Sequence, residues 1–185
     1  MPVTVRPATE ADLPALTRLD LPYPTDRFLS LERSGEPPEL KYALRWRNRV
    51  PAPMAVYATY TVDRLRDALM RTNLFLVAEV DGEAAGFLMI IVPEWTDAAE
   101  MTDLAVDIAF RRMGAGRALI DAAAEWARER GLRALWVEPR ADNQAAISFY
   151  ISMGFRLSGF NDRLYSNADD ADGKPTISMH LELHW

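Results

Sequence analysis

The sequence predicts an α/β protein in which helices flank a sheet of mixed strand direction. A meander of strand-like segments is followed by the order β-α-β-α-β, with amphipathic helices between the later strands. The composition is that of an ordinary globular chain, because 49% of the 185 residues are hydrophobic and 26% are charged. This length is typical of one domain, and we expect a single domain over residues 1–185.

The N-terminal segment predicts a strand followed by a helix. Residues 3–8 alternate in polarity, and Thr9 is followed three residues later by Asp12, the spacing of a capping box at a helix start. Prolines interrupt residues 22–58, where we expect variable loops and edge strands. Within that region, residues 41–49 alternate like a strand.

A helix and a hairpin are predicted next. Residues 60–72 place four apolar side chains at helical spacing on one face, namely Val62, Leu65, Leu69 and Met70. Two β-rich runs, 73–80 and 83–95, are then joined by Asp81 and Gly82. Asp-Gly between two such runs favours a tight hairpin turn.

The remaining segments alternate strands with helices. The predicted elements are a strand at 100–108, a helix at 117–131 that ends at Gly131, a strand at 132–139, a helix at 143–155 that ends at Gly154, and final strands after it.

A glycine-rich turn lies between a strand and a helix, at Gly114 and Gly116. The first N–H groups of a helix have no intrahelical partner, so such a turn can bind an anion such as a pyrophosphate. Arg111, Arg112 and Arg117 add positive charge. Close packing of the helix on the sheet is the alternative explanation for the glycines. Rossmann and Walker motifs are excluded, because the third glycine and the lysine that they require are missing.

These motifs resemble the GNAT acyltransferase superfamily, whose glycine motif (Gln/Arg)-x-x-Gly-x-(Gly/Ala) matches Arg111, Gly114 and Gly116. Further matches in the expected order are the strand at 104–106, Asn143 with Ala146, Phe149 with Tyr150, and Gly154 with Phe155. The resemblance implies a mostly antiparallel central sheet with flanking helices and splayed central strands. It covers a core at about 74–160 and leaves 20–60 as a variable, acceptor-side region.

Within the superfamily, PEWTDAAEMTDLAV and GFRLSGFNDRLY look like the streptothricin acetyltransferase group, although Thr102 stands where that group usually has an acidic residue. The resemblance implies transfer of an acetyl group from acetyl-CoA to a primary amine of a small molecule by direct attack. A protein or peptide amine as acceptor, and a non-catalytic acyl-CoA-binding domain, are the alternatives.

The resemblance also implies the binding residues. The residues expected to bind acetyl-CoA are Leu104, Ala105, Val106, Arg111, Arg112, Met113, Gly114, Ala115, Gly116, Arg117, Asn143, Ala146 and Phe149. An aromatic wall of the acceptor pocket is a further expectation, with edge-strand packing as its alternative; its members are Tyr42, Trp46, Tyr57 and Tyr60.

Two catalytic residues are predicted. Tyr150 matches the family's general-acid tyrosine, which protonates the leaving thiolate; packing against Phe149 is its alternative role. Glu100 and Asp103 are candidate bases for the amine, and a water chain is a third possibility. In a regular strand these two carboxylates face opposite sides. We favour Glu100 because it is four residues from Leu104, a spacing that places both side chains on the same face of a regular strand.

Other partners are not expected. His180, Glu182 and His184 alternate on the last strand, but we interpret them as its solvated face and expect no metal. The net charge of −6 without a basic block disfavours nucleic acid. The apolar run at 87–92 is too short to span a membrane, so a cytoplasmic protein is expected. Members of the family often dimerise, which suggests a homodimer.

Overall fold

A computed structural model describes residues 2–22, 24–53, 60–164 and 175–183. The chain forms two compact units. The first comprises Met1–Pro22, Ala55–Val137 and Leu181–Trp185, and the second comprises Tyr23–Met54 and Glu138–His180.

Helices and strands follow the predicted order along the chain. The strands are β1 (Val3–Pro7), β2 (Pro24–Ser34), β3 (Lys41–Pro53), β4 (Leu74–Val80), β5 (Glu83–Ile91), β6 (Ala98–Val106), β7 (Ala134–Val137), β8 (Arg156–Asn161) and β9 (Thr176–Glu182). The helices are α1 (Leu13–Leu16), α2 (Val62–Arg71), α3 (Ala115–Glu129) and α4 (Gln144–Ser152), with 3₁₀ turns η1 (Glu10–Asp12) and η2 (Ile108–Phe110).

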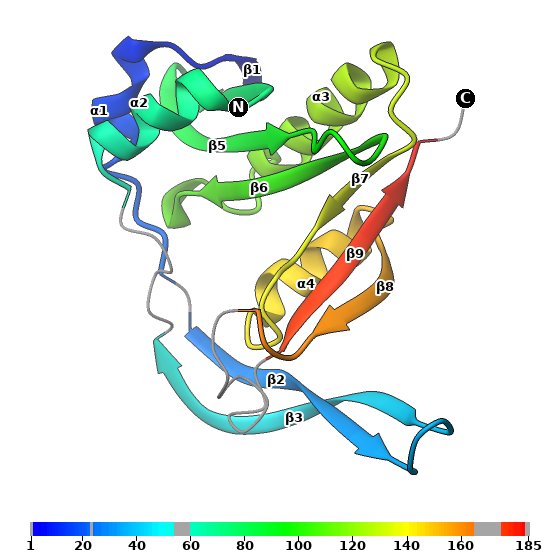
Figure 1. Ribbon diagram of the computed structural model, residues 1–185. Helices are drawn as coiled ribbons and strands as arrows, with labels where there is room; N and C mark the ends of the chain where they lie inside the picture. The colour runs from blue at the N-terminus through cyan, green and yellow to red at the C-terminus, as the bar shows by residue number, and fades with distance from the viewer. Residues whose placement is uncertain (1, 23, 54–59, 165–174, 184–185) are drawn as a thin grey trace. The chain divides into compact units, whose positions relative to one another are not determined.

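The first unit is built on a sheet in the order β1-β4-β5-β6-β7 (Figure 1). Neighbouring strands run antiparallel from β1 to β6, while β6 and β7 are parallel. A mixed, mostly antiparallel sheet with flanking helices was predicted, and this prediction is confirmed.

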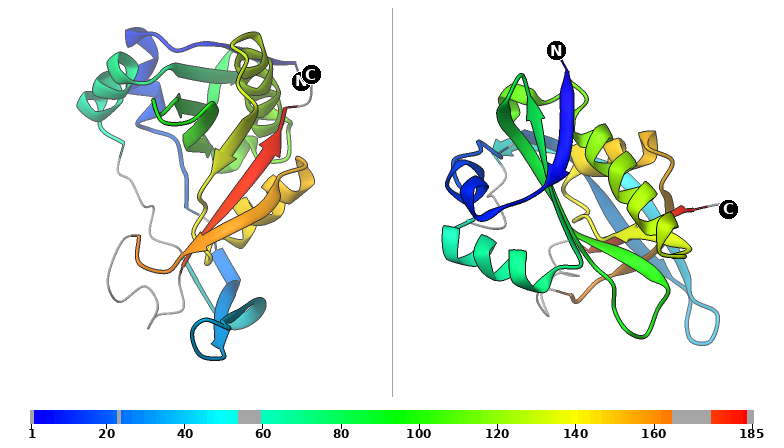
Figure 2. Two further views of the ribbon diagram at one scale, coloured as in Figure 1. Left: turned by 45° about the vertical axis from the view of Figure 1, so that its right-hand side comes forward. Right: turned by 90° about the horizontal axis from the view of Figure 1, so that it is seen from above.

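Helices cover both faces of this sheet. Figure 2 shows α1 and α2 against one face and α3 against the other. Leu13 and Leu16 of α1 and Leu65 of α2 are fully buried against Phe87 and other side chains of the first face. Met70 was predicted to share this apolar face, which is wrong: its side chain is 73% exposed, because position 70 lies well round the helix from Leu65.

The local turn and cap signals are also confirmed. Thr9 and Asp12 form the complete capping box before α1. Asp81 and Gly82 join β4 to β5, with φ values of 51° and 84°. Gly131, with a φ of 70°, follows the end of α3. These positive φ values explain why glycine or aspartate stands at each turn.

The second unit combines a long β2–β3 hairpin with α4 and the antiparallel pair β8–β9 (Figure 1). The 41–49 strand is confirmed as part of β3. Variable loops and edge strands were expected over 22–58 without bounds for β2, which pairs with β3 from Pro24 to Ser34. The hairpin forms a two-stranded sheet of its own, so both of its strands are edge strands, in which proline is tolerated.

No helix in the described ranges is both long enough and apolar enough to cross a membrane.

Candidate active site

The glycine-rich turn contains two residues in the left-handed region of backbone conformation. After η2, the φ angle changes sign from −63° at Arg111 to 68° at Arg112, and Gly114 at the start of α3 has a φ of 97°. Arg111 is extended, with a ψ of 147°, and the positive φ values at Arg112 and Gly114 turn the chain between η2 and the start of α3. Glycine meets this requirement at position 114 with little strain, whereas Arg112 adopts it despite its side chain.

The start of α3 supplies unpaired donors to the same turn. The Ala118 N–H bonds back to the Gly114 carbonyl at 2.9 Å, which begins the helical ladder. The N–H groups of Ala115, Gly116 and Arg117 therefore have no acceptor within the helix. The helix dipole adds positive potential at this end, and the side chains of Arg112 and Arg117 are exposed. The turn can thus hold a pyrophosphate through backbone donors and two cations.

Arg111 has a structural task in the turn. Its Nε donates to the Val106 carbonyl at 3.2 Å, and its Nη2 donates to the Leu21 carbonyl at 2.9 Å. Asp107 makes a parallel link, because its Oδ2 accepts from the Asp20 N–H at 2.7 Å. The motif arginine therefore ties the turn to the N-terminal segment, a role that the sequence analysis missed.

A β-bulge in β6 changes which side chains share a face. Met101 pairs with Ile90 and Asp103 pairs with Met89, so Thr102 is the extra residue. Glu100, opposite Ile91, and Asp103, opposite Met89, therefore lie on the same face of the sheet. The expectation that Glu100 and Leu104 share a face of the sheet is wrong, because the extra residue of the bulge reverses the alternation of side chains between them.

The pairing of β6 with β7 ends at Glu100, before the bulge. Their last pair is Glu100 with Trp136, and β7 ends at Val137, while β6 continues beside β5 to Val106. Among the described residues, Leu104–Val106 therefore has no strand partner on the β7 side. The splayed strands were predicted, and the opening lies along Leu104–Val106, which were predicted to bind acetyl-CoA.

Gly86 allows β5 to pack closely against this segment. A Cβ atom at position 86 would stand 2.4 Å from the Ala105 carbonyl oxygen, which no side chain tolerates. Glycine is thus required where β5 supports the strand that borders the opening.

Tyr60 and Asp103 form a pair that sequence reasoning did not connect. The Tyr60 hydroxyl donates to Asp103 Oδ1 at 2.7 Å, and its ring packs edge-on against Phe87 with centroids 4.9 Å apart. Thr61 caps α2 by accepting from the Arg64 N–H at 3.2 Å, which fixes the backbone beside Tyr60. The two partners are 43 residues apart, so no local spacing could reveal the pair.

The other predicted aromatic residues have separate surroundings. Tyr42 packs against Phe160 at 4.9 Å and Trp46 lies under the Arg27 guanidinium at 5.3 Å, both within the second unit. Tyr57 lies outside the described residues. Edge-strand packing therefore describes Tyr42 and Trp46, and the pair with Asp103 is particular to Tyr60.

The α4 residues belong to the second unit. Asn143 caps this helix, because its Oδ1 accepts from the Ala146 N–H at 2.9 Å. Tyr150 is 5% exposed, and its ring lies 5.8 Å from that of Phe149 and 5.3 Å from that of Phe155. The spacing from Asn143 to Ala146 thus has a local structural reason, and the buried Tyr150 ring packs against two aromatic neighbours.

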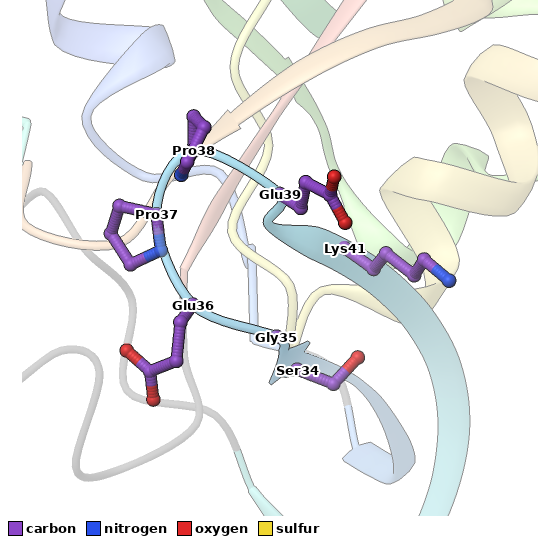
Figure 3. A pocket seen from close by; sticks show the side chains of 7 residues that line it. All are labelled: Ser34, Gly35, Glu36, Pro37, Pro38, Glu39 and Lys41. Carbon is purple, nitrogen blue, oxygen red and sulfur yellow. The ribbon is translucent and has the colours of Figure 1, made fainter.

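Within the described ranges, no group of three or more His, Asp or Glu side chains is arranged to hold a metal ion, and His184 lies outside those ranges. A hollow at the β2–β3 turn is lined by Ser34, Gly35, Glu36, Pro37, Pro38, Glu39 and Lys41. Its charged lining residues, Glu36, Glu39 and Lys41, are of both signs, and Figure 3 shows the Glu36 and Lys41 side chains pointing apart.

The glycine-rich turn that opens α3, beside splayed strands, is the arrangement that the sequence motifs implied. A sequence model of the acetyltransferase (GNAT) family matches residues 40–155, more than half of the chain. The chain belongs to the GNAT family. It is an N-acetyltransferase, and this family uses acetyl-CoA as the acetyl donor.

Known acetyltransferases are similar to this chain over different lengths. A streptothricin acetyltransferase from Streptomyces lavendulae is 31% identical over 185 residues, covering 95% of this chain and 93% of that protein. The [ribosomal protein bS18]-alanine N-acetyltransferase of Escherichia coli (strain K12) is 36% identical over 103 residues, covering 56% of this chain and 68% of that protein.

Solved structures have the same fold. A nourseothricin acetyltransferase aligns with a TM-score of 0.82 at 27% identity, covering all of both chains. A Bacillus anthracis protein assigned as a streptothricin acetyltransferase, solved with acetyl coenzyme A, aligns with a TM-score of 0.77 at 21% identity and covers 98% of this chain and 99% of that one. The second likeness concerns the fold alone.

Proposed function

We propose that this N-acetyltransferase transfers the acetyl group of acetyl-CoA to a primary amine of a small molecule. The main support is the extent of the similarity to the streptothricin acetyltransferase, which spans 95% of the chain. An alignment of that extent includes most of residues 20–60, the region expected to contact the acceptor. The ribosomal-protein acetyltransferase aligns over only 56% of the chain. In this proposal, residues 1–185 act as one catalytic domain.

The first unit would bind the donor. The N–H groups of Ala115, Gly116 and Arg117, with the side chains of Arg112 and Arg117, are suited to the pyrophosphate of coenzyme A. The unpaired edge of Leu104–Val106 offers backbone groups to the amides of the pantetheine arm. A backbone N–H that meets the thioester oxygen would stabilise the developing oxyanion by about 3 kcal/mol.

The reaction would be a direct attack. The neutral amine nitrogen forms a bond to the thioester carbonyl carbon, the carbon–sulfur bond breaks, and the sulfur leaves with the electron pair. The thiolate takes a proton from the Tyr150 hydroxyl, which is later restored from solvent. The proton lost by the amine passes to a carboxylate of β6, Glu100 or Asp103, or to water. The products are an amide and free coenzyme A.

The test is an acetylation assay with purified protein, acetyl-CoA and streptothricin, which follows thiol release and identifies the product by mass spectrometry. We expect acetyl-CoA-dependent conversion of streptothricin to a monoacetylated product. A peptide that begins with alanine serves as the competing acceptor. Acetylation of the peptide but not of streptothricin or a simple polyamine would contradict the small-molecule assignment.

A variant tests the acid. Tyr150→Phe keeps the ring that packs on Phe149 and Phe155 but removes the proton donor. We expect kcat to fall by roughly 100-fold, a typical contribution of a positioned acid, while acetyl-CoA binding measured by calorimetry is unchanged. Full activity of this variant across the pH range would remove Tyr150 from the mechanism.

A further inference from the structure

Asp103 occupies a distinct position in the first unit. It stands just after the bulge and just before Leu104–Val106, where β6 has already parted from β7. Glu100 shares its face but lies earlier, where β6 still pairs with Trp136 of β7. Of the two carboxylates, Asp103 is therefore the one that stands at the opening.

A dedicated partner orients this carboxylate. Tyr60 donates to Oδ1 at 2.7 Å, and the Tyr60 ring itself contacts Phe87 and the Arg64 guanidinium, which lies 5.3 Å from the ring centroid. A hydrogen bond from a neutral hydroxyl leaves the carboxylate with its negative charge. None of the ion pairs formed by the described residues includes Asp103. The charge is oriented but not neutralised by an ion pair within the described chain.

We propose that Asp103 is the docking point for the positive charge of the acceptor and that Tyr60 is its positioning residue. The substrates are then cationic alkylamines, which are protonated near neutral pH as lysine is. This inference rests on the proposed function and adds a substrate class and a specificity residue to it. The overall charge of −6 agrees with a cationic acceptor.

The experiment measures steady-state kinetics with streptothricin and acetyl-CoA for four substitutions, Asp103→Asn, Asp103→Glu, Tyr60→Phe and Glu100→Gln. For Asp103→Asn we expect the KM for streptothricin to rise by about 10-fold or more, with the KM for acetyl-CoA unchanged, because only the acceptor loses a charged partner. Asp103→Glu should recover part of this loss. Tyr60→Phe keeps the ring packing and should raise the same KM by a smaller factor.

Salt dependence separates docking of a charge from a structural effect. The wild-type KM for streptothricin should rise steeply between about 50 and about 500 mM NaCl, since salt screens a charge pair, and this slope should flatten in Asp103→Asn. Asp67→Asn is the matched control, because it removes an equal charge from an exposed ion pair with Arg71 on α2. It should leave both KM values and the salt slope as in the wild type.

The outcomes distinguish this inference from the proposed function. A wild-type protein that acetylates no amine contradicts the proposed function and the docking role with it. An active wild type whose KM and salt slope are insensitive to Asp103→Asn overturns the docking role alone. A rise in KM for Glu100→Gln without one for Asp103→Asn would assign docking to Glu100 and also overturns it.

Discussion

Arg6 links two carboxylates near the N-terminus of the first unit. It donates to both oxygens of Asp12, at 2.8 and 2.6 Å, and also to Glu79 of β4 at 2.5 Å. The Asp12 pKa is lowered from 3.8 to about 2, first through the hydrogen bonds from Arg6. The bonds between Arg6 and the two acids raise the pKa of its guanidinium in turn. One arginine thus joins β1, η1 and β4.

This cluster predicts an acid-dependent loss of stability. Because the folded-state pKa of Asp12 is depressed, its contribution is complete above pH 3.8 and is lost as the pH falls toward about 2. We expect Asp12→Asn to lower the free energy of unfolding by about 1 to 2 kcal/mol at neutral pH, allowing for solvent screening of Arg6. The difference in the free energy of unfolding between the wild type and Asp12→Asn should shrink between pH 4 and pH 2. Urea unfolding at each pH measures this difference.

The exposed pair of Asp67 and Arg71, 2.7 Å apart, is the control for that measurement. Asp67→Asn should change the free energy of unfolding by less than about 0.5 kcal/mol at every pH. A deficit for Asp12→Asn that stays constant down to pH 2 would mean that the charge of Asp12 does not stabilise the fold.

At the scale of elements, α3 has a glycine with positive φ at each end. Gly114 begins the helix at 97° and Gly131 follows it at 70°. A Cβ atom at 114 would approach Val3 Cγ2 to 3.9 Å, an ordinary contact, and one at 131 would meet nothing within 4 Å. Substitution by alanine at either site therefore causes conformational strain without a clash.

The two sites differ in their relation to the donor. Gly114→Ala and Gly131→Ala should each lower the free energy of unfolding by about 1 to 2 kcal/mol. Only Gly114→Ala should also raise the Kd for acetyl-CoA, by roughly 10-fold, equivalent to 1.4 kcal/mol, because it displaces the N–H groups of the turn. Calorimetry at a temperature where both variants are folded checks this. Equal acetyl-CoA affinities in the two variants would remove the turn from the donor site.

For the molecule as a whole, donor binding should be coupled to stability. A ligand that binds only the folded chain, at about 100 times its Kd, stabilises it by about 2.7 kcal/mol. For a chain of this size we expect acetyl-CoA to raise the Tm by roughly 5 to 10 °C. NADH, which has a pyrophosphate but no pantetheine arm, should raise it much less. A shift as large with NADH would mean that the β6 opening contributes nothing to donor binding.

The elements that the sequence predicts well are those set by neighbouring residues. The Asp81-Gly82 hairpin, the Thr9–Asp12 capping box and the helix before Gly131 each follow from contacts a few residues apart, and each is confirmed. The bounds of β2 were not predicted, because the prolines of residues 22–58 indicated only loops and edge strands there. Met70 was misassigned because the predicted apolar face of the helix was too wide, and position 70 lies outside the face that includes Leu65.

The site divides in the same way. The glycine motif and the order of strands and helices are local patterns, so the sequence alone determined the family, the donor and the position of the turn. The partners of Arg111, the bulge at Thr102 and the bond from Tyr60 to Asp103 were decided by tertiary structure. Each depends on the register between segments distant along the chain, and a single extra residue in a strand reverses which side chains share a face.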